Sequence, residues 1–148
     1  MDIRTIEQTI DIDAAKERVW AVLLEDATYR EWAAEFMAGS YAETDWREGS
    51  PVRFLGPDGT GLLGRVVTAR RPEVVDVEYE GVVGDGRDDR DSHAARRYAG
   101  TRETYRLTGA GGRTHLAISA PMEGQYYEDM VVAWDRALAK VKELAEAR

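Results

Sequence analysis

The last stretch of the chain, residues 123–148, has the residue spacing of one long amphipathic helix. Its apolar residues recur at intervals of three and four positions, so they share one face of a helix, whereas charged residues occupy the opposite face. The apolar face consists of Tyr127, Met130, Val131, Trp134, Leu138, Val141, Leu144 and Ala145. A helix with a single apolar stripe must bury that stripe against another layer. The rest of the chain must therefore supply a surface for this helix to cover.

The preceding sequence predicts that this surface is an antiparallel β-sheet. Residues 3–12 alternate between apolar and polar side chains, which is the period-2 pattern of a half-buried strand. The alternation returns after residue 39, where turns divide it into strands at 39–47, 51–56, 60–70, 73–82, 99–109 and 113–121. Within 73–82, Val75, Val77 and Tyr79 share one face and acidic residues share the other. We expect Pro121 to end the last strand.

Two short helices are expected after the first strand. Asp13 is positioned to cap a helix that begins at residue 14, and Asp26 to cap a second helix that extends to Phe36. Residues 84–98 are dense in alternating charge without a sustained apolar pattern, which predicts a mobile loop. This order predicts a single α+β domain, residues 1–148, in which a curved seven-stranded antiparallel sheet packs against the long C-terminal helix.

Composition narrows the range of functions. The 20 basic and 28 acidic residues give a formal charge of −8, which disfavours nucleic acid as a partner. The absence of cysteine excludes disulfides and thiolate ligands, and two histidines are too few for a His-rich zinc site. No apolar run is long enough to span a membrane and no secretory signal is indicated, so a cytoplasmic location is expected. We expect neither a metal nor a cofactor.

Several local phrases resemble one known superfamily. They are Ala15-x-x-x-x-Trp20, Tyr29-x-x-Trp32, the run from Trp46 to Phe54, and Gly59-Thr60-Gly61. With the order of elements, they resemble the START-like or SRPBCC superfamily, in the branch related to activators of the heat-shock-protein ATPase and to polyketide cyclases. The resemblance implies the helix-grip fold, in which a curved sheet and short helices form a cavity that the long helix closes. It transfers no catalytic residue, because these phrases mark structure.

The candidate ligand contacts lie where the concave face of such a sheet meets the long helix. Two packing outcomes remain open: the apolar side chains fill the core, or they leave a partial cavity for a flat or elongated apolar molecule. Ligand contacts are predicted for Phe54, Val77, Tyr79, Glu103 and Tyr105 on the sheet and for Tyr127, Met130 and Trp134 on the helix.

Glu103 is the candidate catalytic residue. Alternation places it on the same face as Tyr105 and Leu107. A carboxylate directed into an apolar cavity has a raised pKa, and it can act as a general acid or base or orient a ligand hydroxyl. The alternative is an ion pair at the rim of the sheet, with Arg102, Arg106 or an arginine of a neighbouring strand.

Two further arginines, Arg53 and Arg65, lie in adjacent predicted strands. We expect them to pair with Glu43 or Glu78 on the outer surface. An arginine that turned inward would instead anchor a carboxylate or phenolate ligand. His115 is expected to face solvent, and the other histidine lies in the charged loop.

Three functions remain open at this point. The first is binding of a small hydrophobic molecule, aromatic, polyketide-like or lipid-like, between the sheet and the C-terminal helix. The second is a cyclase-type or hydratase-type enzyme in which Glu103, Tyr79 or Tyr105 moves protons in the same cavity. The third is a co-chaperone-like interaction with another protein through the acidic surface or residues 84–98. Tyr126 and Val132, on the flank of the long helix, are candidates for a homodimer contact.

Overall fold

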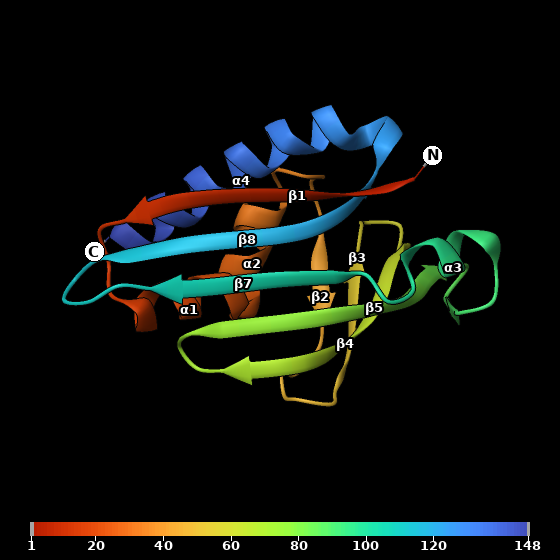
Figure 1. Ribbon diagram of the computed structural model, residues 1–148, viewed down its shortest axis with the longest axis horizontal. Coiled ribbons are helices and arrows are strands. Elements are labelled where there is room, and N and C mark those ends of the chain that lie inside the picture. The colour runs from red at the N-terminus through yellow and green to blue at the C-terminus, as the bar shows by residue number, and fades with distance from the viewer. Residues whose placement is uncertain (1, 148) are drawn as a thin grey trace.

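The computed structural model describes residues 2–147 and has the helix-grip arrangement (Figure 1). The strands are β1 (Ile3–Ile12), β2 (Tyr41–Glu43), β3 (Pro51–Leu55), β4 (Gly61–Arg70), β5 (Val74–Gly84), β6 (Arg87–Asp89), β7 (Arg102–Thr108) and β8 (Thr114–Glu123). The helices are α1 (Lys16–Leu24), α2 (Asp26–Ala33), α3 (His93–Tyr98) and α4 (Tyr127–Glu146), and a 3-10 turn at Gly124–Tyr126 precedes α4. No helix in residues 2–147 has both the length and the apolar character that a membrane crossing requires.

The sheet pairs its first strand in the sequence with its last. Its strand order is β1-β8-β7-β5-β4-β3-β2, and the short β6 pairs with β5 beside this path. β1 pairs with β8 along its whole length, from Ile3 opposite Glu123 to Ile12 opposite Thr114. All pairings are antiparallel. The structure therefore confirms the predicted seven-stranded antiparallel sheet and adds β6 as an eighth strand.

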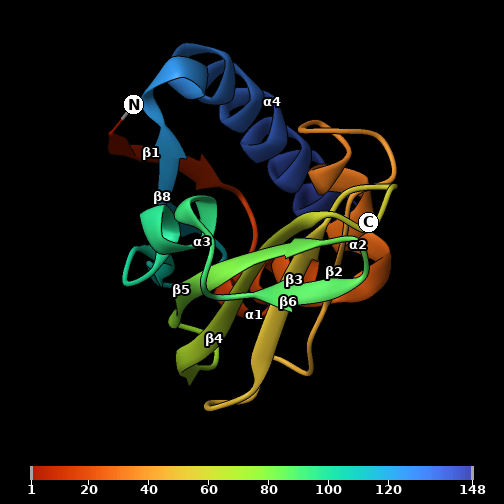
Figure 2. The same ribbon diagram turned by 90° about the vertical axis from the view of Figure 1, so that its right-hand side faces the viewer.

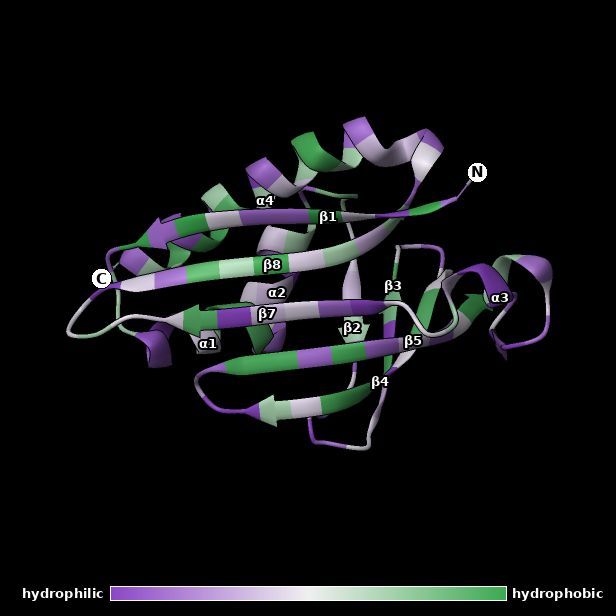
Figure 3. Cartoon of the chain, in the orientation of Figure 1, coloured by the Kyte–Doolittle hydropathy of each residue, from purple (hydrophilic) through white to green (hydrophobic). Residues whose placement is uncertain are grey.

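Alternation of side chains decides which face of the sheet is buried. In β5, Val75, Val77 and Tyr79 are buried, whereas Asp76 and Glu78 are partly exposed. Figure 3 shows this alternation as bands of opposite hydropathy along the strand. Because a slip of one residue would turn the apolar set to solvent, burial of this face fixes the register of the strand.

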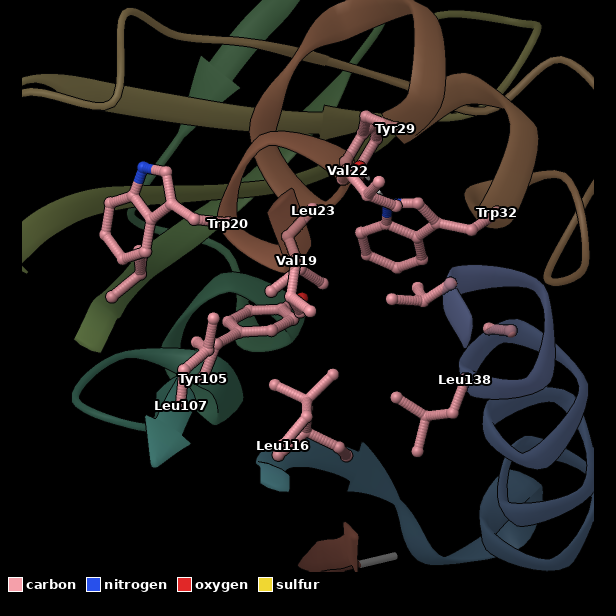
Figure 4. Close-up of a cluster of buried hydrophobic side chains, with 14 of the residues drawn as sticks. Val19, Trp20, Val22, Leu23, Tyr29, Trp32, Tyr105, Leu107, Leu116 and Leu138 are labelled. Carbon is pink, nitrogen blue, oxygen red and sulfur yellow. Dashed lines mark hydrogen bonds between the residues drawn. The ribbon is translucent and has the colours of Figure 1, made fainter. Parts of the chain in front are cut away.

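α4 lies across the concave face of the sheet (Figure 2). The side chains that it buries are Ala133, Trp134, Ala137, Leu138, Val141 and Ala145. Most of them belong to one hydrophobic core, which also contains Val19, Val22 and Leu23 of α1 and Leu107 and Leu116 of the sheet (Figure 4). A large apolar side chain stabilises a fold by about 1.5–3 kcal/mol when it is fully buried. The second half of α4 is therefore chiefly a packing element.

The prediction of a mobile loop at residues 84–98 is wrong. The segment contains the end of β5, then β6 and α3. Ser92 caps α3, since its Oγ accepts a hydrogen bond from the Ala95 backbone N–H. α3 buries Ala95 and Tyr98, and the Tyr98 ring meets the Tyr79 ring edge-on at a centroid distance of 6.3 Å. A helix of six residues offers too few apolar positions for its periodicity to stand out in the sequence.

Two strand boundaries also differ from the prediction. β2 covers only Tyr41–Glu43 instead of residues 39–47, and Trp46 adopts a left-handed backbone conformation with φ of 58° that a strand does not allow. Pro121 does not end β8. It lies opposite Thr5 of β1, and the strand continues to Glu123 before α4 begins.

The two predicted aspartate caps are wrong as well. The N-cap of α1 is Ala15, which makes no side-chain hydrogen bond, and the Asp13 backbone N–H donates to Glu146 Oε2 of α4 at 2.8 Å. Asp26 is the first residue of α2 rather than its N-cap, and its carboxylate pairs with Arg30 at 2.9 Å. The start of α1 is thus tied to the end of α4 by a contact between distant parts of the chain.

Arg53 and Arg65 lie on the outer surface as expected, but the predicted partners are wrong. Arg53 donates two hydrogen bonds to Asp88, of 2.6 and 2.8 Å, and Arg65 Nε donates to Glu80 Oε2 at 3.0 Å. Asp88 lies on β6, the strand that the sequence did not predict. His115 is on the solvent side of β8, as expected.

Gly81 offers a test of how the β6 segment packs. A Cβ atom at this position would lie 2.1 Å from the Asp89 carbonyl oxygen, so β6 would have to shift. We expect Gly81→Ala to lower the free energy of unfolding by about 1–3 kcal/mol, which is the usual cost of overpacking. Urea unfolding followed by tryptophan fluorescence measures this change.

Gly84→Ala is the matched control, because a Cβ at Gly84 meets nothing within 4 Å. Its free energy of unfolding should change by about 0.5 kcal/mol or less. Equal losses in the two variants would contradict the close contact between Gly81 and β6.

Candidate functional site

A cavity of about 340 Å³ lies between the concave face of the sheet, α2 and the first half of α4. Seven of the 21 residues that line it are aromatic: Tyr29, Trp32, Phe36, Phe54, Tyr79, Tyr105 and Trp134. The volume falls at the lower end of the range for small-molecule pockets, about 300–1,000 Å³. Of the two packing outcomes that the sequence left open, the structure has the partial cavity at this end of α4.

The aromatic side chains hold one another in place. Trp134 packs against Phe36 and Trp32, with ring-centroid distances of 4.8 and 6.2 Å, and Trp32 meets Tyr29 edge-on at 4.8 Å. The Trp32 indole N–H donates to the Val22 carbonyl of α1 at 3.2 Å, so the polar end of this ring is satisfied by the backbone. Large rings fixed at several contacts cannot move inward to fill the space, and the cavity persists.

Glu103 is buried in this cavity and is held by two tyrosines. It lies opposite Val77 in the pairing of β7 with β5. Side chains two residues apart share a face, which places Tyr105 beside Glu103 on β7 and Tyr79 beside it on β5. The Tyr79 hydroxyl donates to Oε1 at 2.7 Å, and the Tyr105 hydroxyl donates to Oε2. Each carboxyl oxygen therefore has one phenolic donor.

The alternative ion pair for Glu103 at the rim of the sheet is wrong. Arg102 and Arg106 alternate with Glu103 along β7 and are exposed on the outer face. Arg102 binds Asp76 and Glu78 there, with N···O distances of 2.6 and 3.1 Å.

Burial governs the protonation of this cluster. Loss of hydration raises the pKa of Glu103, and the hydrogen bonds from Tyr105 and Tyr79 offset only part of that effect. Burial and the nearby Glu103 charge raise the pKa of both tyrosines well above its ordinary value. The site thus combines a carboxyl group that titrates at a higher pH than an exposed glutamate with two phenols that keep their protons.

The structure places most of the predicted ligand contacts around the cavity. The lining includes Phe54, Tyr79, Glu103, Tyr105, Met130 and Trp134. It does not include Val77, which is fully buried in the core, or Tyr127, whose ring stacks under the Arg4 guanidinium at 3.8 Å. Contact between a ligand and the six lining residues stays a prediction.

Sequence reasoning missed the part of the lining that comes from the helices and turns. Tyr29, Trp32 and Phe36 have helical spacing, but they were not among the predicted ligand contacts. Met37 and Asp58 lie in the connections before β2 and before β4, where no periodic pattern marks them. The Tyr29-x-x-Trp32 phrase was the available signal, since it puts two large rings on one side of a short helix.

A second hollow, of about 540 Å³, lies beside Trp20 and Trp46. Its lining includes the charged residues Glu25, Asp45, Arg47, Glu48 and Arg71. It is larger than the aromatic cavity but offers opposite charges that can neutralise one another, so we regard the aromatic cavity as the candidate site.

Comparison with known proteins assigns the family. Residues 13–146 match the family described as Activator of Hsp90 ATPase homolog 1-like protein, and the chain belongs to this family. This confirms the branch that the sequence phrases indicated. A comparison with curated proteins gives no match.

Solved structures share the fold at low sequence identity. CalU16 from Micromonospora echinospora has a TM-score of 0.65 and 19% identity over 97% of this chain and 77% of CalU16. The Aha1 dimer from Colwellia psychrerythraea has a TM-score of 0.71 and 16% identity over 97% of this chain and 96% of Aha1. DynU16, from the dynemicin biosynthetic locus, has a TM-score of 0.67 and 13% identity over 97% of this chain and 47% of DynU16. Identities this low establish a common fold.

The raised pKa of Glu103 predicts a pH-dependent loss of stability. The folded state binds the Glu103 proton more tightly than the unfolded state, in which the pKa is near 4.5. The contribution of Glu103 to stability is therefore fully present below pH 4.5 and is lost as the pH rises through the folded-state pKa. We expect wild type to lose free energy of unfolding relative to Glu103→Gln across this window, by at most about 1.4 kcal/mol per pH unit.

Urea unfolding of both proteins from pH 4 to pH 8 measures this difference. The comparison removes the contributions of the other carboxylates, which the two proteins share. A difference that does not change with pH would show that Glu103 has an ordinary pKa.

Proposed function

We propose that this protein binds a small, largely apolar molecule with a flat ring system in the cavity between the sheet, α2 and α4. The observation that carries the proposal is the aromatic wall, which encloses about 340 Å³ of space instead of closing on itself. Flat rings can stack on Trp32 and Trp134 from α2 and α4 and on Tyr105 from the sheet. DynU16 shares the fold and comes from a biosynthetic locus, an association that supports a small-molecule ligand.

The cavity has a mouth through which such a molecule can enter. The lining includes Met37 and Ser40, which follow α2. It also includes Asp58 and Thr60, which lie in the connection between β3 and β4. Met37 is 58% exposed, so an apolar side chain is available at the entrance. Apolar surface at the mouth and polar groups around it suit a ligand that arrives from water.

Binding of a neutral apolar probe tests this proposal. N-phenyl-1-naphthylamine gains fluorescence in apolar surroundings, and we expect saturable binding to wild type together with a raised melting temperature. Met130→Trp replaces an unbranched side chain on the cavity wall with a large ring and should weaken binding by about tenfold or more.

Val132→Trp is the control for this variant. It adds the same ring to α4 at a position that is 51% exposed and outside the cavity lining, so affinity should stay within about twofold of wild type. Absence of saturable binding to wild type, or equal losses in the two variants, would refute the cavity as the binding site.

The hydrogen-bonded Glu103 favours a second candidate function, an enzyme that moves a proton on a bound apolar substrate. A carboxylate in an apolar site can remove a proton from a carbon next to a carbonyl group. Once Glu103 has taken up that proton, the Tyr79 O–H can turn from Glu103 to the enolate oxygen and donate a hydrogen bond to it. The same carboxyl then returns a proton to that carbon, so the group is regenerated.

Exchange of the α-protons of 2-tetralone in deuterated water tests the second function. This bicyclic ketone presents an acidic carbon, and NMR follows the loss of its signal. An enzyme of this type should exchange the protons about 10²-fold to 10⁴-fold faster than its Glu103→Gln variant does. Equal rates in the two proteins would remove proton transfer by Glu103 and leave binding as the function.

A further inference from the structure

Both charged side chains that line the cavity are acidic. Glu103 lies inside the cavity and Asp58 lies at its mouth. Among residues 2–147, no lysine, arginine or histidine belongs to the lining. The arginine that the sequence analysis considered as an inward anchor for a carboxylate or phenolate therefore has no counterpart in the site.

The arginines of the neighbouring strands are engaged elsewhere. Arg53, Arg65 and Arg102 point away from the cavity and bind Asp88, Glu80 and Asp76 on the outer side of the sheet, with N···O distances of 2.6, 3.0 and 2.6 Å. An anionic ligand in the cavity would meet the Glu103 carboxylate without a compensating positive charge. Burial of such a ligand is unfavourable, because an unpaired charge loses its hydration.

Glu103 has acceptor capacity beyond its two tyrosine contacts. An ionised carboxylate has about four acceptor positions, and the two hydroxyls occupy one on each oxygen. The rings of Tyr105 and Trp134 are close by, with centroids 6.2 Å apart. Aromatic ring faces attract cations, most strongly for tryptophan. The carboxylate and the aromatic rings thus both favour a positive charge in a ligand.

We propose that the natural ligand carries a positive charge, as a protonated amine or a quaternary ammonium on an aromatic body, and binds with this charge directed at Glu103. The inference rests on the proposed binding function and specifies its ligand class. Glu103 supplies the countercharge, and Tyr79 and Tyr105 hold its carboxylate in place. The rings that line the cavity contact the body of the ligand.

Three naphthalene compounds that differ only in their head group test the charge preference. They are 2-naphthylmethylamine, which is protonated at neutral pH like a lysine, 2-naphthylmethanol and 2-naphthoate. Each competes with bound N-phenyl-1-naphthylamine at pH 7 in about 0.15 M salt, where exposed charges are largely screened. We expect the amine to bind about tenfold or more tighter than the alcohol, and the carboxylate to bind more weakly than the alcohol.

Two variants test whether Glu103 causes the preference for the amine. Glu103→Gln keeps the shape of the side chain and removes the charge, so the amine and the alcohol should bind within about twofold of each other. Glu7→Gln changes the net charge by the same amount at an exposed position on β1, and it should keep the wild-type order. If Glu103→Gln does not fold, the order of the affinities of wild type and of Glu7→Gln for the three compounds decides whether the site prefers a positive charge.

The outcomes separate this inference from the function on which it rests. Binding of N-phenyl-1-naphthylamine with equal affinities for the amine and the alcohol would overturn the cationic ligand and leave the binding function intact. An amine preference that survives in Glu103→Gln would overturn the role of Glu103. No binding of any of the four compounds would overturn the binding function, and the cationic ligand with it.

Discussion

The contact between α4 and the concave face of the sheet is the interaction on which the other features depend. Along its second half, small and branched side chains such as Ala137, Leu138 and Val141 are buried in the main hydrophobic core. Along its first half, Trp134 meets Trp32 and Phe36, whose rings are too large and too firmly held to close the remaining space. One helix therefore completes the core at one end and covers a cavity at the other, because the size of its side chains changes along its length.

The same cavity contains a group that reduces stability. A buried carboxyl loses hydration that two phenolic hydrogen bonds replace only in part, which is why burial raises the pKa of Glu103. An apolar residue at this position would avoid that cost, but it would leave the buried hydroxyls of Tyr79 and Tyr105 without their acceptor. Features that cost stability and are placed in a cavity are typical of functional sites. The proposed ligand chemistry therefore depends on the position of Glu103 more than on the fold.

The sequence was sufficient to predict the parts of the fold that repeat a pattern over many residues. Alternation predicted β1 and β5, and the stripe of α4 predicted the helix. Alternation also put Glu103 on the face of Tyr105, but the alternative of an ion pair at the rim stayed open until the structure showed its two tyrosine partners. Features that depend on contacts between distant residues were missed. β6 and α3 are too short for a period to appear, and Asp13 donates to Glu146 from the other end of the chain. For the same reason, the rings from α2 were not among the predicted ligand contacts, since their place on the cavity wall depends on α4 and the sheet.

The pairing of β1 with β8 has a consequence for the order in which the protein is made. β1 leaves the ribosome before the other strands, its partner β8 is the last strand to follow, and α4 comes after β8. Until then the apolar side of β1, which includes Ile6 and Ile12, has no partner, and pairings between such distant segments form slowly. The cavity cannot exist before α4 is synthesised. A molecule that binds in the cavity therefore cannot serve as a template for the early chain, and it can bind only after α4 is in place.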